Sequence, residues 1–260
     1  MICDDFPTTR PVARQVAISR PLEWLRLGFR DFHKAPTDCL LYGCAFVLMG
    51  CLLDAYLELA PELELSFATL FLLAGPFLAI GLYDVSRQME AFDGRGRVKL
   101  GHALIAWRRN LSSFSLFSVI LAFLTAAWFL CSLLLFALFY DGSAAPTPSE
   151  LLAGGLRGEH LDFLLCYLAA LLLFALLVFA ISVVSIPLLL DEPDVDAMTA
   201  ILASVQVVRR NLLTMAAWAA IIAAMTAIGF ATYFLGLIII MPVLALSSWH
   251  AYRDLITFER

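Results

Sequence analysis

The chain has 260 residues, of which 62% are hydrophobic and 15% are charged, and its formal net charge is -5 at pH 7. Soluble domains carry about 25% charged residues, so this composition excludes an ordinary soluble globular domain and indicates a membrane protein. The six Cys residues form no CxxC pair and show no metal-ligand spacing with His, so we expect neither a disulfide scaffold nor a zinc site.

The N-terminal residues 1–19 lack the apolar stretch of a signal peptide, and we predict that they form a retained, flexible cytoplasmic tail. Residues 20–34 are predicted to form an amphipathic helix that lies in the cytoplasmic membrane interface. Its apolar stripe consists of Leu22, Leu25, Phe29 and Phe32. A similar stripe further along the chain consists of Met198, Ile201, Leu202, Val205 and Leu212.

Five apolar runs are long enough to cross a bilayer, which takes about 20 helical residues. They cover residues 39–57, 65–83, 114–140, 163–190 and 212–248. The last run has 37 residues and would form a helix of about 55 Å, far longer than the bilayer is thick. We therefore predict a break near residues 229–236, which gives six spans; one unbroken helix, giving five spans, is the alternative.

The positions of Lys and Arg bear on this count, because cytoplasmic loops of membrane proteins are enriched in both residues. With six spans, all of the 17 Lys and Arg residues except Arg157 lie on the side of the two termini. We expect this side to be the cytoplasm and the membrane to be the bacterial inner membrane. With five spans, Arg253 and Arg260 would move to the other side, which would weaken the asymmetry without reversing it.

The motif Arg-Arg-Asn occurs at residues 108–110 and again at 209–211, each time between an amphipathic stretch and an apolar run. A span with a Pro, an aliphatic run and an acidic exit recurs three times. We predict an all-α polytopic membrane bundle of six transmembrane helices in three repeated hairpins, each preceded by an amphipathic cytoplasmic interfacial helix. The repeats cover about residues 20–92, 98–191 and 196–256 of a single membrane domain, 20–260. Alternatively, apolar helices merely look alike.

Several residues inside the predicted spans are candidates for a functional role. Three prolines either act as hinges that open a vestibule or are packing kinks. They are Pro76, Pro187 and Pro242. Asp54 interrupts the first span and is either part of a polar site or hydrated near the outer interface. Gly43 and Gly50 lie on the same small-residue face as Asp54, and we expect this face to permit a close helix contact.

Acidic residues at the cytoplasmic exits of the Pro-containing spans, together with three arginines, form our candidate polar cluster. We expect Asp84, Asp191 and Asp254 to pair with Arg109, Arg210 and Arg30. Such a cluster would act as a gate or as a docking surface, and ordinary interfacial ion pairing is the alternative.

The segment at residues 92–102 is basic and rich in Gly but lacks the Lys-Ser/Thr ending of a phosphate-binding loop. We expect Arg97, Lys99 and Arg108 to contact anionic lipid headgroups instead. The four His residues have no metal-ligand spacing, and none falls inside a predicted span, so we expect no metal, haem or other cofactor. No nucleophile motif is present, and we predict no enzymatic activity.

Three stretches carry a resemblance to a known family. They are "RLGFRDFHKAP" at residues 26–36, "GPFLAIGLYDVSRQME" at 75–90 and "IPLLLDEPDVDAMTAILASVQVVRRN" at 186–211. With them, the chain resembles a domain-of-unknown-function family of proteobacterial integral membrane proteins, some of them labelled as a cytochrome c oxidase subunit. A haem-copper subunit needs several intramembrane His ligands, which this chain lacks. The resemblance therefore implies a membrane location and an accessory or assembly role beside a respiratory complex.

Three functions remain open. The first is a non-enzymatic accessory or scaffold protein with a membrane-protein partner. The second is a small-solute or ion transporter, suggested by the repeats, the prolines and Asp54. The third is an anionic-lipid-binding protein, suggested by the basic amphipathic helices. In each case we expect membrane lipids, and no nucleic acid, as partners.

Overall fold

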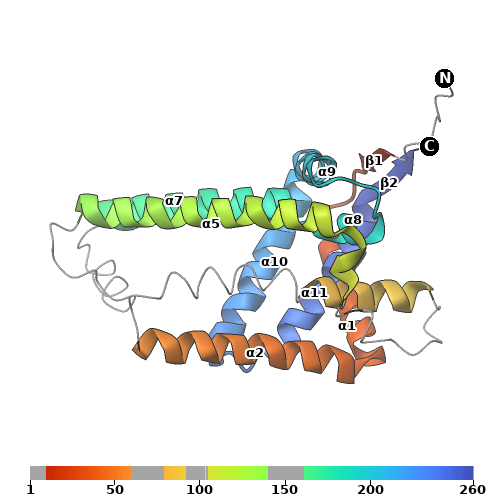
Figure 1. Ribbon diagram of the computed structural model, residues 1–260, viewed down its shortest axis with the longest axis horizontal. Helices are drawn as coiled ribbons and strands as arrows, with labels where there is room; N and C mark the ends of the chain where they lie inside the picture. The colour runs from red at the N-terminus through yellow and green to blue at the C-terminus, as the bar shows by residue number, and fades with distance from the viewer. Residues whose placement is uncertain (1–9, 60–78, 92–102, 104, 140–160, 260) are drawn as a thin grey trace. The chain divides into compact units, whose positions relative to one another are not determined.

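The computed structural model of the chain describes residues 10–59, 79–91, 103, 105–139 and 161–259 (Figure 1). The described residues are predominantly helical, as predicted, and add one small two-stranded sheet. They fall into two compact units, one from residues 1–118 and 180–260 and the other from residues 119–179. The candidate sites described below lie in the first unit.

In the first unit, α11 (Leu237–Leu255) packs against α1 (Arg20–Lys34) and α2 (Pro36–Leu59), as Figure 1 shows. Helices α1 and α2 meet at an angle of 107°. This bend falls at Ala35, since the residue before a proline avoids the helical conformation. A Cβ on Gly43 would lie 2.0 Å from the Ile238 carbonyl oxygen, so only glycine permits this approach. The predicted close contact at Gly43 is therefore confirmed.

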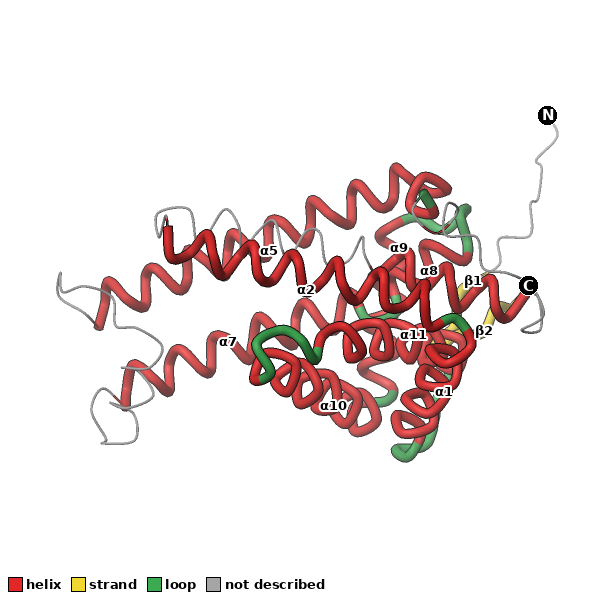
Figure 2. The backbone as a smooth tube through the Cα atoms, turned by 90° about the horizontal axis from the view of Figure 1, so that it is seen from below, coloured by secondary structure: helices red, strands yellow, loops and turns green. Residues whose placement is uncertain are grey.

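The last apolar run is broken where we predicted a break. Helix α10 (Leu212–Ala231) ends before a short loop, visible in Figure 2, and α11 begins at Leu237. Tyr233 and Phe234 in the loop have positive φ values of 51° and 65°, which stop helix propagation. The Thr232 hydroxyl donates to the Gly229 carbonyl at 2.8 Å and accepts the Gly236 amide at 2.8 Å. These bonds close the turn, so the run consists of two helices.

The two Arg-Arg-Asn motifs place their asparagines at equivalent points. Asn110 ends the 3-10 helix η2 (Ala106–Asn110) ahead of α5 (Leu111–Phe139). Asn211 lies between α9 (Ala197–Arg210) and α10. Each side chain is buried and donates to the backbone of a distant segment: Asn110 to the Val195 carbonyl and Asn211 to the Arg14 carbonyl, both at 2.9 Å. In both motifs, the asparagine thus anchors the start of an apolar helix.

The N-terminal segment differs from the flexible tail predicted for residues 1–19. Strand β1 (Arg10–Ala13) pairs antiparallel with β2 (Ile256–Glu259), and Arg10 lies opposite Glu259. The Val16 amide then donates to Asn211 Oδ1 at 2.8 Å. These bonds join the two ends of the chain, and no local sequence pattern predicts such a pairing. Residues 1–9 lie outside the described residues.

The apolar stripes of α1 and α9 are not covered by the protein. Leu22 and Phe29 of α1 are 67% and 38% exposed, and Met198 and Leu202 of α9 are 52% and 58% exposed. The inward faces bury Trp24, Gly28 and Asp31 in α1, and three alanines, Ser204 and Val207 in α9. A water-soluble helix instead turns its apolar stripe toward the protein core. The uncovered stripes are therefore suited to lie in a membrane interface.

The described residues of the second unit, 119–139 and 161–179, belong to α5 and to α7 (Leu161–Ser182). Trp128 of α5 lies against Tyr167 and Phe174 of α7, with ring centroids 5.4 and 5.6 Å apart. The ring centroids of Phe136 and Phe163 are 5.1 Å apart. Because Phe136 follows Trp128 in α5 while Phe163 precedes the partners of Trp128 in α7, the two helices run antiparallel. Most of their remaining apolar side chains are exposed, which is typical of helices solvated by lipid.

The described residues contain fewer candidate spans than the six predicted. Three helical stretches are long and apolar enough to cross a membrane: Arg108–Phe139, Leu161–Asp191 and Leu212–Ala231. A fourth results if α1 and α2 form one bent span. The predicted span at residues 65–83 lies mostly outside the described residues. Helix α11 is not among the three, because polar residues fill its C-terminal half.

Candidate functional site

Polar side chains crowd the last turns of α11, where the sequence reads WHAYRD at residues 249–254. The helical repeat of 3.6 residues points successive side chains toward different neighbours. Five of these six residues bind a side chain of another segment; we call them, with their partners, the α11 hub. The α11 members of the hub are Trp249, His250, Tyr252, Arg253 and Asp254.

One side of the hub joins the helix at residues 79–91 to α8 (Ser185–Asp191). Trp249 Nε1 and Arg253 Nε donate to the two carboxylate oxygens of Glu90, at 3.2 and 3.3 Å. Tyr252 donates its hydroxyl to Asp191 at 2.8 Å, and Arg253 Nη1 donates to the same oxygen at 3.3 Å. Burial, followed by the negative charge of Asp191, raises the pKa of Tyr252, so this hydroxyl remains a donor at neutral pH.

A second part of the hub joins α11 to the start of α1. Asp254 Oδ2 accepts from Arg20 Nε at 2.6 Å and from Trp24 Nε1 at 3.0 Å. Burial alone would raise the pKa of Asp254. The hydrogen bonds from Arg20 and Trp24 outweigh burial, so the pKa lies below its ordinary value and the carboxylate is stabilised in its charged form.

A third part lies near the end of α1, where Asp31 is only 3% exposed. One of its oxygens is 2.7 Å from His250 Nε2, and the other accepts from Lys34 at 3.1 Å. Burial opposes ionisation of Asp31, but the contacts with His250 and Lys34 prevail and lower its pKa. Gly28, one turn earlier, brings the two helices together, since a Cβ there would overlap the Ser247 hydroxyl.

The structure brings two of the three predicted aspartates into the hub but gives them other partners. Asp254 pairs with Arg20 instead of Arg30, and Asp191 pairs with Arg253 instead of Arg210. Arg210 donates to the Ala13 carbonyl at 2.8 Å, beside β1. Sequence reasoning did not single out the other hub residues, which are Arg20, Trp24, Asp31, Lys34, Glu90, Trp249, His250, Tyr252 and Arg253. The run of polar residues at the end of an apolar helix was the available signal.

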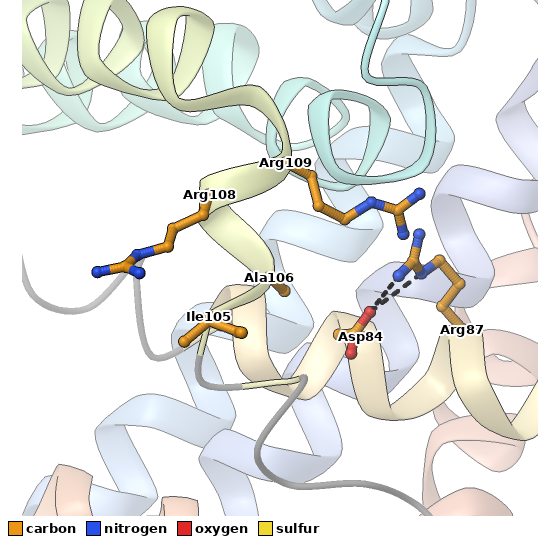
Figure 3. A pocket seen from close by; sticks show the side chains of 6 residues that line it. All are labelled: Asp84, Arg87, Ile105, Ala106, Arg108 and Arg109. Carbon is orange, nitrogen blue, oxygen red and sulfur yellow. Dashed lines mark hydrogen bonds and ion pairs between the residues drawn. The ribbon is translucent and has the colours of Figure 1, made fainter.

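The third aspartate, Asp84, lies in a separate pocket of about 320 Å³ (Figure 3). The lining residues are Asp84, Arg87, Ile105, Ala106, Arg108 and Arg109. Asp84 is 1% exposed and binds Arg87 and, at 2.7 Å, Gln88 Nε2. Arg109 extends toward the Arg87 guanidinium, whereas Arg108 points away from it. Asp84 and Arg109 thus line one pocket, but Arg87, and not the predicted Arg109, is the ion-pair partner of the aspartate.

The remaining candidates from the sequence are the three prolines, Asp54 and the predicted lipid-contacting residues. Pro187 in α8 and Pro242 in α11 are both buried, which favours packing kinks over open hinges. Asp54 lies in the last turns of α2. Pro76, Arg97 and Lys99 lie outside the described residues. Among the described residues, no group of three or more His, Cys, Asp or Glu side chains could hold a metal ion.

These features define a predominantly helical integral membrane protein whose charged side chains gather at helix ends. Residues 65–191, just under half of the chain, match DUF2189, a family described as a predicted integral membrane protein. This match confirms the resemblance to a family of integral membrane proteins, and it includes Asp84, Glu90 and Asp191. No curated protein and no solved structure matches the chain.

Proposed function

We propose that the protein is a non-enzymatic accessory or scaffold component of a complex in the bacterial inner membrane. The observation that carries this proposal is the α11 hub. All four hub carboxylates, Asp31, Glu90, Asp191 and Asp254, are in hydrogen-bond contact with a side chain of another helix. Groups held in this way fix helix ends and are not poised as nucleophiles or bases. The family resemblance makes a respiratory complex the first partner to test.

The proposed topology has six spans and both termini in the cytoplasm. The β1–β2 pairing supports it, because two strands can pair only on one side of a membrane, which requires an even number of crossings. The exposed apolar stripes of α1 and α9 support interfacial helices ahead of the first and third hairpins. The antiparallel contact of α5 and α7 supports the middle hairpin.

Transport is the second candidate, and two observations argue against it. Hydroxyl groups within the apolar helices bond to their own backbone: Thr125 donates to Leu121 at 2.9 Å and Ser247 donates to Val243 at 2.7 Å. Such hydroxyls do not need water in a polar path. In addition, Pro187 and Pro242 are packed rather than open to a vestibule.

The test is photo-crosslinking in native membranes. A benzophenone side chain at Leu172, which is 60% exposed on α7, should capture another membrane protein. The matched control is the same group at Phe163, which is 1% exposed and packed against Phe136, and which should crosslink only within the chain. A discrete adduct that co-purifies in mild detergent supports the scaffold. Lipid adducts alone, at Leu172 and at other exposed leucines of α5 and α7, would overturn it.

A further inference from the structure

We propose that the pocket between the helix at residues 79–91 and η2 binds the phosphate group of an anionic phospholipid. Arg87, Arg109 and one aspartate, Asp84, are among its lining residues, and these three side chains together carry a net positive charge. The hub does not include any of these side chains, and the scaffold proposal does not depend on them.

The arrangement of charges leaves room for an anion. Arg87 uses Nε and Nη2 to bind a single oxygen of the buried Asp84, so this aspartate does not engage Arg87 Nη1. Across the pocket, the guanidinium of Arg109 points toward that of Arg87 (Figure 3). Within the described part of the chain, Arg109 has no acidic partner. Two guanidinium groups that face each other repel, and an anion between them removes the repulsion. Phosphate is the matching ligand, because guanidinium binds its oxygens in a forked geometry.

The position of the pocket indicates a lipid as the source of the phosphate. Arg109 lies two residues before Leu111, the first residue of the apolar helix α5, a rise of about 3 Å along a helix. Leu111 is 51% exposed, and Ile105 on the pocket wall is 49% exposed. A phosphate held by Arg87 and Arg109 would therefore lie level with the headgroups, with apolar side chains beside it for the glycerol and the upper acyl chain. Arginines at this depth attract anionic lipids.

The test measures lipid binding to the purified full-length protein by native mass spectrometry in detergent. The probes are dioleoyl-phosphatidylglycerol, dioleoyl-phosphatidylcholine and inorganic phosphate. The variant is Arg109→Gln, which removes an exposed guanidinium without leaving Asp84 unpaired. The matched control is Arg209→Gln, which removes an exposed guanidinium from the second Arg-Arg-Asn motif, where Arg209 corresponds to Arg108. Arg109→Lys is also measured, because lysine keeps the positive charge but loses the planar pair of N–H donors of the guanidinium.

We expect Arg109→Gln to weaken phosphatidylglycerol binding on the order of tenfold, the usual effect of one charge-assisted hydrogen-bonding group. Arg209→Gln and phosphatidylcholine binding should change less than twofold, and Arg109→Lys should fall between wild type and Arg109→Gln. The proposed site would be overturned if phosphatidylglycerol binding fell equally in the two glutamine variants, or if Arg109→Gln did not weaken it. Displacement of phosphatidylglycerol by equimolar inorganic phosphate would overturn the lipid as occupant.

Discussion

Asp254 holds two donors of α1 at once, the guanidinium of Arg20 and the indole N–H of Trp24. Trp24 is fully buried, so its N–H has no access to water if the acceptor is removed. We expect Asp254→Ala to lower the free energy of unfolding by about 1–3 kcal/mol, the usual cost of a buried polar group left without a partner. Denaturant titration in micelles, followed by circular dichroism, measures this change.

The control for Asp254 is the ion pair of Arg26 and Glu23, whose charged atoms are 3.7 Å apart on the exposed face of α1. An exposed pair of this kind contributes little, so Arg26→Ala should cost about 0–1 kcal/mol. If both alanine variants lowered the stability equally, the hub would not have the structural role assigned to it.

Asp31 makes the stability of the protein dependent on pH. Its pKa in the folded state is lowered, despite burial, by contacts with His250 and Lys34. A lowered folded-state pKa gives stability that is present above the unfolded-state pKa, about 4, and is lost as the pH falls through the folded-state pKa. Asp31→Asn should therefore lower the unfolding temperature at pH 7 and make it less dependent on pH below about 4, as thermal melts across this range would show.

Asp38, a few residues away in the first turn of α2, provides an opposite control. Burial raises its pKa, so its contribution is favourable below the unfolded-state pKa and is lost as the pH rises through the folded-state pKa. Asp38→Asn should leave the stability at pH 7 unchanged or slightly increased. Equal destabilisation by Asp31→Asn and Asp38→Asn at pH 7 would contradict the assignment of the hub.

Among the elements, α2 approaches α11 at Gly43 and the loop before α11 at Gly50, and the two glycines have different surroundings. A Cβ on Gly43 would overlap the backbone of Ile238, whereas a Cβ on Gly50 would meet the ring of Phe234 at 2.8 Å. A ring can move aside, and a helix backbone cannot without shifting α11. We expect Gly43→Ala to cost about 1–3 kcal/mol and Gly50→Ala less, in the same unfolding assay. A larger loss for Gly50→Ala would argue against this packing.

Asn211 connects a second set of elements, since it binds both Arg14 and Val16 of the N-terminal segment. Asn211→Ala removes these bonds, and we expect it to release the segment that follows β1. Amide hydrogen exchange should then be faster at residues 14–17, with little change in α11. Asn211→Asp keeps the acceptor for Val16 but loses the donor to Arg14, and should show an intermediate effect. Unchanged exchange in both variants would contradict the anchoring role.

At the scale of the whole molecule, the apolar helices could be predicted because their signal is local. The run at residues 114–140 corresponds to α5, and the excess length of the last run indicated the break before α11. The hub partners on different helices could not be predicted, since they lie 61 to 234 residues apart and depend on how helices pack. The assumption that equivalent repeats pair across the bundle led to Arg30 and Arg210. Strand β1 was missed because its partner, β2, is at the other end of the chain.

The account rests on the joining of both chain ends beside the α11 hub, on one side of a membrane. Paired reporter fusions in living cells test this directly, with green fluorescent protein and alkaline phosphatase attached in turn at residue 1 and at residue 260. We expect both ends to give fluorescence and neither to give phosphatase activity, as cytoplasmic ends do. Fluorescence from one end with phosphatase activity from the other would mean an odd number of crossings, which is incompatible with β1 pairing with β2.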